Sequence, residues 1–215
     1  MSGSTVLIAD DHPRFRQALQ LAVARAQPGS QVIETTTLAD ALDAARLAPN
    51  LDLVLLDLRM SDCQGFAGLA QLHAERPGVP ILVVSGVDQP DAEARARRFG
   101  AVGFVPKASD LDAMASAIAA ALRGEVRPMA PDPDPGEREL SDVADRIASL
   151  TPTQLRVLLG VLAGRLNKQI AYDLNIAEAT VKAHMTAVLR KLNVLNRTQA
   201  ALAARALALE PEPAV

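Results

Sequence analysis

The sequence predicts an α/β domain followed by a smaller all-α domain, and three observations support this division. Up to about residue 125, short β-branched runs alternate with amphipathic stretches, which is typical of a parallel sheet with crossover helices. Prolines and acidic residues then concentrate between Gly124 and Leu150. No strand signal follows Thr151. A chain of 215 residues is long enough for two domains, each with its own core.

The first domain, residues 1–125, is predicted to contain five β/α repeats. The strands are expected at Thr5–Ala9, Gln31–Thr35, Leu51–Leu56, Pro80–Val84 and Val102–Val105. The helices are expected at Pro13–Ala26, Leu38–Leu47, Phe66–Glu75, Asp91–Phe99 and Asp110–Arg123. Gly100 follows the fourth helix, where a left-handed residue commonly ends a helix.

Residues 126–149 are predicted to form a linker. Its closely spaced prolines disfavour a helix and favour an extended, semi-rigid spacer. The second domain, residues 150–210, is predicted to be all-α. Its four helices are expected at Pro152–Ala163, Asn167–Leu174, Glu178–Leu192 and Arg197–Leu209.

Composition narrows the possible functions. Only five aromatic residues and no Trp occur, so a stacking platform for RNA or single-stranded DNA is disfavoured. The single cysteine, Cys63, cannot form an internal disulfide. No basic leader precedes the first strand, and the longest apolar runs are far shorter than the ~20 residues that cross a bilayer. We therefore expect a cytoplasmic protein with no membrane span.

Charge is distributed unevenly along the chain. Residues 1–125 hold 11 Lys and Arg against 15 Asp and Glu, and residues 126–149 hold 3 against 6. Residues 150–215 hold 8 against 4, which leaves the C-terminal part basic. A basic domain behind an acidic one is compatible with nucleic-acid binding, although a basic surface alone does not establish it.

Polar residues follow four of the predicted strands. Asp10 and Asp11 follow the first, Asp57 the third and Ser85 the fourth, and Lys107 lies just beyond the fifth. If the strand order is 2-1-3-4-5, strands one and three are neighbours and the three carboxylates converge at the carboxyl edge of the sheet. Carboxylates this close repel one another unless a hard cation lies among them, and oxygen ligands suit Mg²⁺.

Ser85 and Lys107 extend this chemistry. A hydroxyl and an ammonium group can bind the oxygens of a phosphoryl group attached to Asp57, while Mg²⁺ neutralises the remaining charge. Asp57 is then the nucleophile. Each residue alone is compatible with an ordinary cap, turn or surface position, so the prediction depends on their shared placement at strand ends.

The motifs ADDHPRFR (9–16), LVLLDLRM (53–60), VVSG (83–86) and GFVPK (103–107) resemble the receiver domains of response regulators, over residues 5–123. The resemblance implies a flavodoxin-like (βα)5 fold and an Asp57 that accepts phosphate from a sensor histidine kinase. It implies Mg²⁺ on Asp10, Asp11, Asp57 and the Arg59 backbone carbonyl, with Ser85 and Lys107 on the phosphoryl group. Phe104 resembles the switch aromatic that turns inward when Ser85 moves.

Two positions depart from the receiver pattern. Ser61 stands where the family usually has Pro, and Gln64 stands where it commonly has Asp. Neither is a pocket ligand in the family, so we expect altered loop dynamics and phosphate lifetime with the chemistry retained. His12 is interpreted as a residue at the pocket rim, with no catalytic role.

The segment 167–192 has the spacing of a helix-turn-helix motif. Ala171, Asn175 and Val181 provide the small contact residue, the left-handed turn residue and the apolar anchor of the second helix. Lys182 and Arg190 fall on the outward face of that helix, which suits a DNA major groove. The alternative to a DNA-binding motif is a small helical bundle with a solvated basic face.

The motifs LTPTQLRVL (150–158), NKQIA (167–171), ATVKAHM (179–185) and NRTQA (196–200) resemble the output domain of the LuxR/NarL class, over residues 150–209. The resemblance implies double-stranded DNA as a partner and a homodimer formed through the last helix on activation. The implied DNA contacts are Lys168, Thr180, Lys182, Ala183, His184, Thr186, Arg190 and Lys191. Ala177 departs from the Ser or Thr cap of the recognition helix, and Gln154 from the usual Glu.

Together these features predict a DNA-binding transcriptional response regulator that catalyses only its own phosphotransfer and dephosphorylation. A flavin protein is disfavoured because carboxylates occupy the first loop, and an aspartyl phosphatase because adjacent aspartates replace its DxD spacing. The remaining alternative is a phosphorylation-independent helix-turn-helix regulator controlled by dimerisation or a small ligand.

Overall fold

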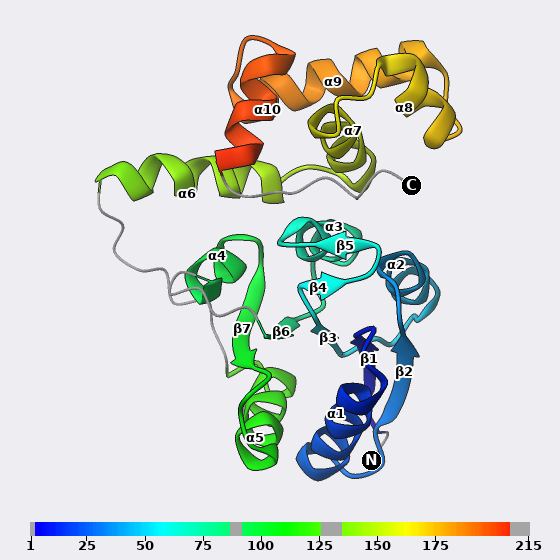
Figure 1. Ribbon diagram of the computed structural model, residues 1–215, viewed down its shortest axis with the longest axis vertical. Helices are drawn as coiled ribbons and strands as arrows, with labels where there is room; N and C mark the ends of the chain where they lie inside the picture. The colour runs from blue at the N-terminus through cyan, green and yellow to red at the C-terminus, as the bar shows by residue number, and fades with distance from the viewer. Residues whose placement is uncertain (1–2, 87–91, 126–134, 207–215) are drawn as a thin grey trace.

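The computed structural model describes residues 3–86, 92–125 and 135–206. The N-terminal domain is built on a parallel five-stranded sheet in the order β2-β1-β3-β6-β7 (Figure 1). Its strands are β1 (Thr5–Ala9), β2 (Gln31–Thr35), β3 (Leu53–Leu56), β6 (Ile81–Ser85) and β7 (Ala101–Pro106). This is the predicted doubly wound order, so β1 and β3 are neighbours and their carboxyl ends lie together.

Five helices cover the two faces of the sheet. They are α1 (Pro13–Ala26), α2 (Leu38–Leu47), α3 (Ala67–Glu75), α4 (Ala92–Arg98) and α5 (Leu111–Leu122). Alternate residues of each strand point to opposite faces. Val6 and Ile8 therefore pack with α1 and α5, whereas Leu7 and Ala9 pack with α2, α3 and α4. Both faces of the central strands β1, β3 and β6 are buried, which explains why these three strands consist of nearly continuous apolar residues, whereas the edge strand β2 is only partly buried.

The predicted strands and helices of this domain agree with the structure to within two residues where both are described. Asp91, the predicted start of the fourth helix, lies outside the described residues. The sequence did not predict the short hairpin formed by β4 (Arg59–Met60) and β5 (Cys63–Gln64). Asp62 in its turn accepts hydrogen bonds from the Leu38 and Ala39 backbone N–H groups, so the hairpin helps to cap α2.

The prediction that residues 126–149 contain no helix is wrong for their second half. The helix α6 (Pro135–Ala148) occupies this segment. Pro135 is the last proline of the cluster and stands at the first turn, where its missing N–H costs no hydrogen bond. Ala144 and Ile147 of α6 are buried in the hydrophobic cluster that contains Leu155 and Leu158 of the following helix. Tertiary packing therefore stabilises a helix that proline content alone disfavoured.

The C-terminal domain contains the four predicted helices. They are α7 (Pro152–Leu162), α8 (Asn167–Asp173), α9 (Glu178–Leu192) and α10 (Arg197–Ala206), and the predicted end of the last helix at Leu209 lies outside the described residues. Thr151 and Gln154 form a capping box at the start of α7, so Gln154 performs the capping role of the usual Glu. Asn175 has φ of 52° between α8 and α9, as its turn position requires.

The two domains are in contact through one layer of helices (Figure 1). Helix α3 packs against α6 and α7, and α4 packs against α6. The hydrophobic cluster on the α2, α3 and α4 side of the sheet consequently continues into the C-terminal domain. Within the part of the chain that the structure describes, every helix is too short or too polar to cross a membrane.

Gly100 has φ of 93°, and a Cβ atom there would lie 2.5 Å from Nδ1 of His73. Burial lowers the pKa of the His73 imidazole. We expect Gly100→Ala to lower the free energy of unfolding by about 2 kcal/mol, because it combines an unfavourable backbone conformation with a steric clash. Urea denaturation measures this change. Gly78→Ala is the control, since a Cβ there has no atom within 4 Å; equal losses in both variants would contradict the explanation.

Candidate functional site

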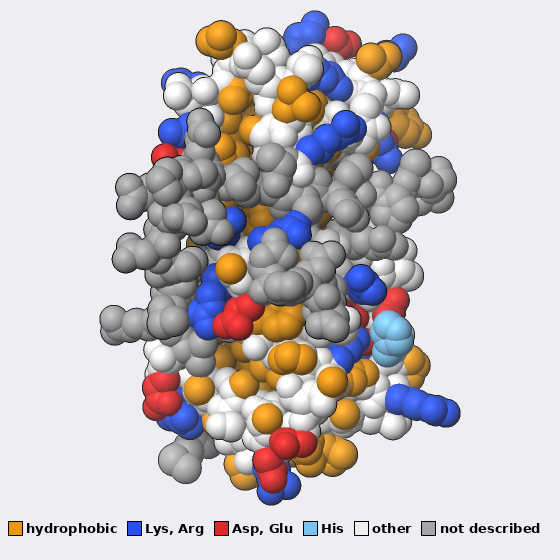
Figure 2. All heavy atoms as spheres, turned by 60° about the vertical axis from the view of Figure 1, so that its left-hand side comes forward, with side chains coloured by type: hydrophobic (Ala, Val, Ile, Leu, Met, Phe, Trp, Pro, Cys, Tyr) orange, Lys and Arg blue, Asp and Glu red, His pale blue; other side chains and the backbone are white. Residues whose placement is uncertain are grey.

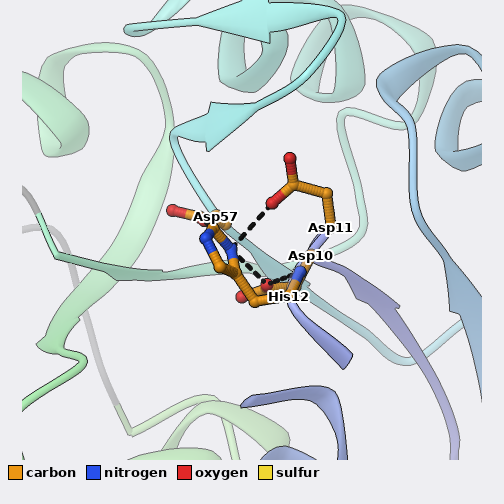
Figure 3. Close-up of side chains that lie close together, drawn as sticks. All are labelled: Asp10, Asp11, His12 and Asp57. Carbon is orange, nitrogen blue, oxygen red and sulfur yellow. Dashed lines mark hydrogen bonds and ion pairs between the residues drawn. The ribbon is translucent and has the colours of Figure 1, made fainter. Parts of the chain in front are cut away.

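The acidic site lies at the carboxyl ends of β1 and β3, as predicted. Asp10 and Asp57 are buried, with 0% and 3% of their surface exposed, whereas Asp11 is half-buried. The His12 side chain lies over the carboxylates (Figure 3). Its Nδ1 atom is 2.7 Å from Asp11 Oδ1 and 3.3 Å from Asp10 Oδ1. Sequence reasoning placed His12 at the rim, and its side chain, 63% exposed, occupies that position while facing inward.

Ser85 at the end of β6 and Lys107 just after β7 converge on Asp57. Lys107 Nζ donates a hydrogen bond to Asp57 Oδ2 at 2.7 Å and forms an ion pair with Asp10 Oδ2 at 2.6 Å. Ser85 Oγ donates to Asp57 Oδ1 at 2.9 Å. Lys107 also lies 4.6 Å from the centre of the Phe15 ring, so a cation–π contact helps to hold it. One ammonium group thus links the two buried carboxylates.

The donor set fits a hard divalent cation. Asp10, Asp11, His12 and Asp57 each offer one ligand atom, and these atoms lie within 4.8 Å of one another. Asp10 Oδ2 and Asp11 Oδ1 are buried oxygens whose close contacts are the ion pairs with Lys107 Nζ and His12 Nδ1, and neither receives a further hydrogen bond from a described residue. Three carboxylates with free oxygen lone pairs suit Mg²⁺, which prefers oxygen ligands and retains several waters.

A cavity of about 470 Å³ opens onto this site. Arg14, Arg59 and Lys107 contribute positive charge to its lining. Asp57 lines the same cavity and is negatively charged. The Arg59 N–H donates to Asp57 Oδ1 at 3.1 Å, which fixes the backbone of the predicted carbonyl ligand beside the carboxylate. Basic groups around a small acidic centre favour the approach of an anion such as a phosphoryl group.

The remaining receiver positions lie around this pocket. Phe104 is half-buried on β7, opposite Val83 of β6, two residues before Ser85. Ser61 is exposed in the turn between β4 and β5, and Gln64 ends that hairpin. The structure therefore places both unusual positions in the hairpin that follows Asp57.

The proposed reading face lies on α9 and the start of α8. Val181, Met185 and Val188 of α9 are buried, which leaves Lys182, Ala183 and Thr186 exposed on its outer face. The other predicted contacts are exposed or half-buried: Lys168, Thr180, His184, Arg190 and Lys191. On the face shown in Figure 2, Lys and Arg side chains are more frequent than Asp and Glu over the C-terminal domain at the top.

Three of these side chains already have partners in the chain. Lys182 pairs with Glu178 at 3.0 Å, and both side chains are well exposed, so DNA can displace this weak contact. The Thr186 hydroxyl donates to the Lys182 carbonyl. Lys191 Nζ donates to the Ser149 carbonyl at 2.7 Å, which gives it a structural role at the end of α6. Ala177 provides no side-chain cap for α9, as expected.

The sequence did not predict two arginines that stabilise the backbone next to the acidic site and at the end of α9. Arg16 donates to the Asp10 carbonyl at 2.8 Å and pairs with Glu34, which fixes the end of β1. Arg146 of α6 donates to the Leu192 carbonyl at the end of α9. Arg16 lies in the ADDHPRFR motif, but nothing in its spacing shows that it reaches a backbone carbonyl.

Comparison with known proteins gives two family matches. Residues 6–119 match the response regulator receiver domain, and residues 148–204 match the bacterial regulatory proteins of the luxR family. The chain is 44% identical to the glycerol metabolism activator of Pseudomonas putida, covering 93% of this chain and 94% of that protein. It is 34% identical to the nitrate/nitrite response regulator protein NarP of Escherichia coli, covering 92% of each.

Full-length FixJ from B. japonicum shares the fold, with a TM-score of 0.51 and 24% identity over 97% of this chain and 99% of the other. Its similarity supports the two-domain fold and no more specific property.

Removing one charge from the acidic cluster allows the repulsion between its carboxylates and their binding of a metal ion to be measured separately. In a chelating buffer, Asp11→Asn is expected to raise the free energy of unfolding by about 1 kcal/mol, because a half-buried like charge is removed. Mg²⁺ is expected to stabilise the wild type and to stabilise the variant much less. Thermal and urea denaturation with and without Mg²⁺ measure both effects. Asp43→Asn, on an exposed carboxylate paired with Arg46, is the control and should respond to Mg²⁺ like the wild type.

Proposed function

Because the chain belongs to the response regulators that join a receiver domain to a LuxR-type DNA-binding domain, and is a transcription regulator, we propose that phosphorylation of Asp57 controls its activity. The observation that carries this proposal is the convergence of Ser85 and Lys107 on the two oxygens of the buried Asp57 carboxylate. The phosphodonor is the phosphohistidine of a sensor kinase.

The transfer step follows from these contacts. An Asp57 oxygen attacks the phosphorus atom, an O–P bond forms, the N–P bond breaks, and the leaving imidazole nitrogen takes up a proton. Lys107 and the Ser85 hydroxyl then bind phosphoryl oxygens instead of the free carboxylate. Asp10, Asp11, Asp57 and the Arg59 carbonyl would hold Mg²⁺, which would supply the charge neutralisation that phosphoryl transfer needs. The protein catalyses this transfer and its own dephosphorylation, in which water attacks phosphorus, the O–P bond to Asp57 breaks, and inorganic phosphate leaves the free carboxylate.

The switch connects this chemistry to the surface. When the Ser85 hydroxyl leaves Asp57 Oδ1 for a phosphoryl oxygen, Phe104 on the neighbouring strand gains room to turn inward. This movement reshapes the surface around α4 and β7. Helix α4 packs against α6, so the change reaches the element that joins the two domains.

The output is binding of double-stranded DNA as a homodimer. Two copies of α9 enter successive major-groove half-sites, and α10 provides the contact between copies. Lys182, Ala183 and Thr186 face base edges, and Lys168, His184, Arg190 and Lys191 contact phosphates or the groove edge. Thr180 is a further DNA contact. The Pseudomonas putida relative named as a glycerol metabolism activator favours an activating role in the use of glycerol.

Asp57→Asn is expected to abolish phosphorylation. After incubation with Mg²⁺ and a small phosphodonor, intact mass spectrometry should detect one phosphoryl adduct on the wild type and none on the variant. Size-exclusion chromatography with light scattering should detect dimers only in the phosphorylated sample. Omitting Mg²⁺ should also remove the adduct.

A helix-turn-helix regulator that acts without phosphorylation is expected to give different results in the same two measurements. The side chains of Lys182, Ala183 and Thr186 are exposed without a phosphoryl group, so DNA binding by unmodified protein is sterically open. A wild type that gains no adduct and already binds DNA as a dimer would overturn the phosphorylation proposal in favour of control by dimerisation or a small ligand.

Two lysines distinguish base reading from backbone binding. Lys182→Ala is expected to reduce the preference for the target site over random DNA, because Lys182 contacts base edges. Lys168→Ala should weaken binding to all sequences similarly and reduce the salt dependence of log K by about one phosphate contact. Fluorescence anisotropy at several salt concentrations measures both. Identical effects of the two substitutions would contradict this division of roles.

A further inference from the structure

A cavity of about 250 Å³ lies between the two domains. Gln71 of α3 forms its receiver wall, and residues of α7 and α8 form the opposite wall. Leu159, Ile170 and Leu174 make part of that wall apolar. The cavity shares no lining residue with the cavity at Asp57, so it is a separate site.

Gln71 is an unusual residue for this position. Only 6% of its surface is exposed, yet its Nε2 group has no hydrogen-bond partner among the described residues. A buried amide donor without an acceptor costs free energy, so native structures generally supply a partner. The cavity that Gln71 lines is where such a partner can lie.

Arg156 adds a second free donor to the same cavity. Its side chain lines the cavity, and no ion pair or hydrogen bond joins its guanidinium group to any part of the chain that the structure describes. The other two charges in the wall, Arg165 and Asp173, pair with each other. The free groups are therefore hydrogen-bond donors, and the uncompensated charge is positive.

We infer that this cavity binds a small organic or inorganic oxyanion, a carboxylate or a phosphate group, between Gln71 of the receiver domain and Arg156 of the DNA-binding domain. A guanidinium group and an amide N–H are the natural donors for carboxylate and phosphate oxygens. The volume is below the range of drug-sized ligands but exceeds by several times the ~30 Å³ of one water. The apolar wall accommodates a short hydrocarbon chain.

Such a ligand has a structural consequence. It accepts hydrogen bonds from both domains at once, so it stabilises the arrangement in which α3 lies against α7. This inference does not depend on phosphoryl transfer at Asp57, because it concerns a different cavity and a different set of residues.

The test uses the full-length, unphosphorylated protein in a chelating buffer, labelled with ¹⁵N. The side-chain amide signal of Gln71, assigned by its absence in Gln71→Met, is followed during titration with inorganic phosphate, butyrate and butylamine. We expect a saturable shift with at least one anion and none with the amine. A shift with phosphate alone identifies a phosphate-type ligand, and a shift with butyrate alone identifies a carboxylate with an apolar chain. Shifts with both anions identify a general oxyanion site.

Arg156→Gln supplies the matched comparison, because this exposed side chain can be replaced without disturbing the core. It is expected to weaken anion binding about 10-fold or more, since it removes a charged hydrogen-bond donor. Arg123→Gln, on an exposed arginine paired with Glu125 outside the cavity, should leave the affinity unchanged. If neither anion gives a saturable shift, or if Arg156→Gln binds as tightly as the wild type, the cavity holds only water and the inference is wrong.

Discussion

The Lys107 ammonium group is the interaction on which the receiver site depends. It lies within 2.7 Å of both Asp10 and Asp57, and it therefore ties the ends of β1, β3 and β7 together. With neither a cation nor a phosphoryl group in the site, loss of this contact would leave a buried carboxylate with an uncompensated charge, which is far more costly than an unpaired surface charge. The strand order makes the contact possible, because only neighbouring parallel strands bring residues 10 and 57 to one edge.

The same sheet determines how the domains meet. The hydrophobic cluster on its α2, α3 and α4 side continues into the C-terminal domain, where α3 packs against α6 and α7. The contact leaves α9 with an exposed outer face. Docking by itself therefore does not cover the reading surface, and control of DNA binding is better sought in how two copies pair than in masking.

Periodicity predicted most of the fold because it reports burial directly. Alternating or continuous apolar runs located β1, β2 and the helices, and strand ends identified Asp10, Asp57, Ser85 and Lys107. Predictions from local sequence patterns failed where contacts between residues far apart in the sequence determine the structure. Helix α6 forms because Ala144 and Ile147 are buried in the hydrophobic cluster with Leu155 and Leu158 of α7, and the proline content of its flank gave the opposite prediction. The inward-facing His12 and the unsatisfied Gln71 depend on packing that no sequence pattern encodes.

Helix α6 also determines where the C-terminal domain can be separated from the rest of the chain. Arg146 and Lys191 form reciprocal hydrogen bonds between α6 and the end of α9, to the carbonyls of Leu192 and Ser149. The C-terminal turn of α9 is thus held by the segment that precedes α7. In a gene fusion, the transferable C-terminal unit therefore begins at α6 near Pro135, because a breakpoint at Thr151 would separate Arg146 and Ser149 from the end of α9 to which they are hydrogen-bonded.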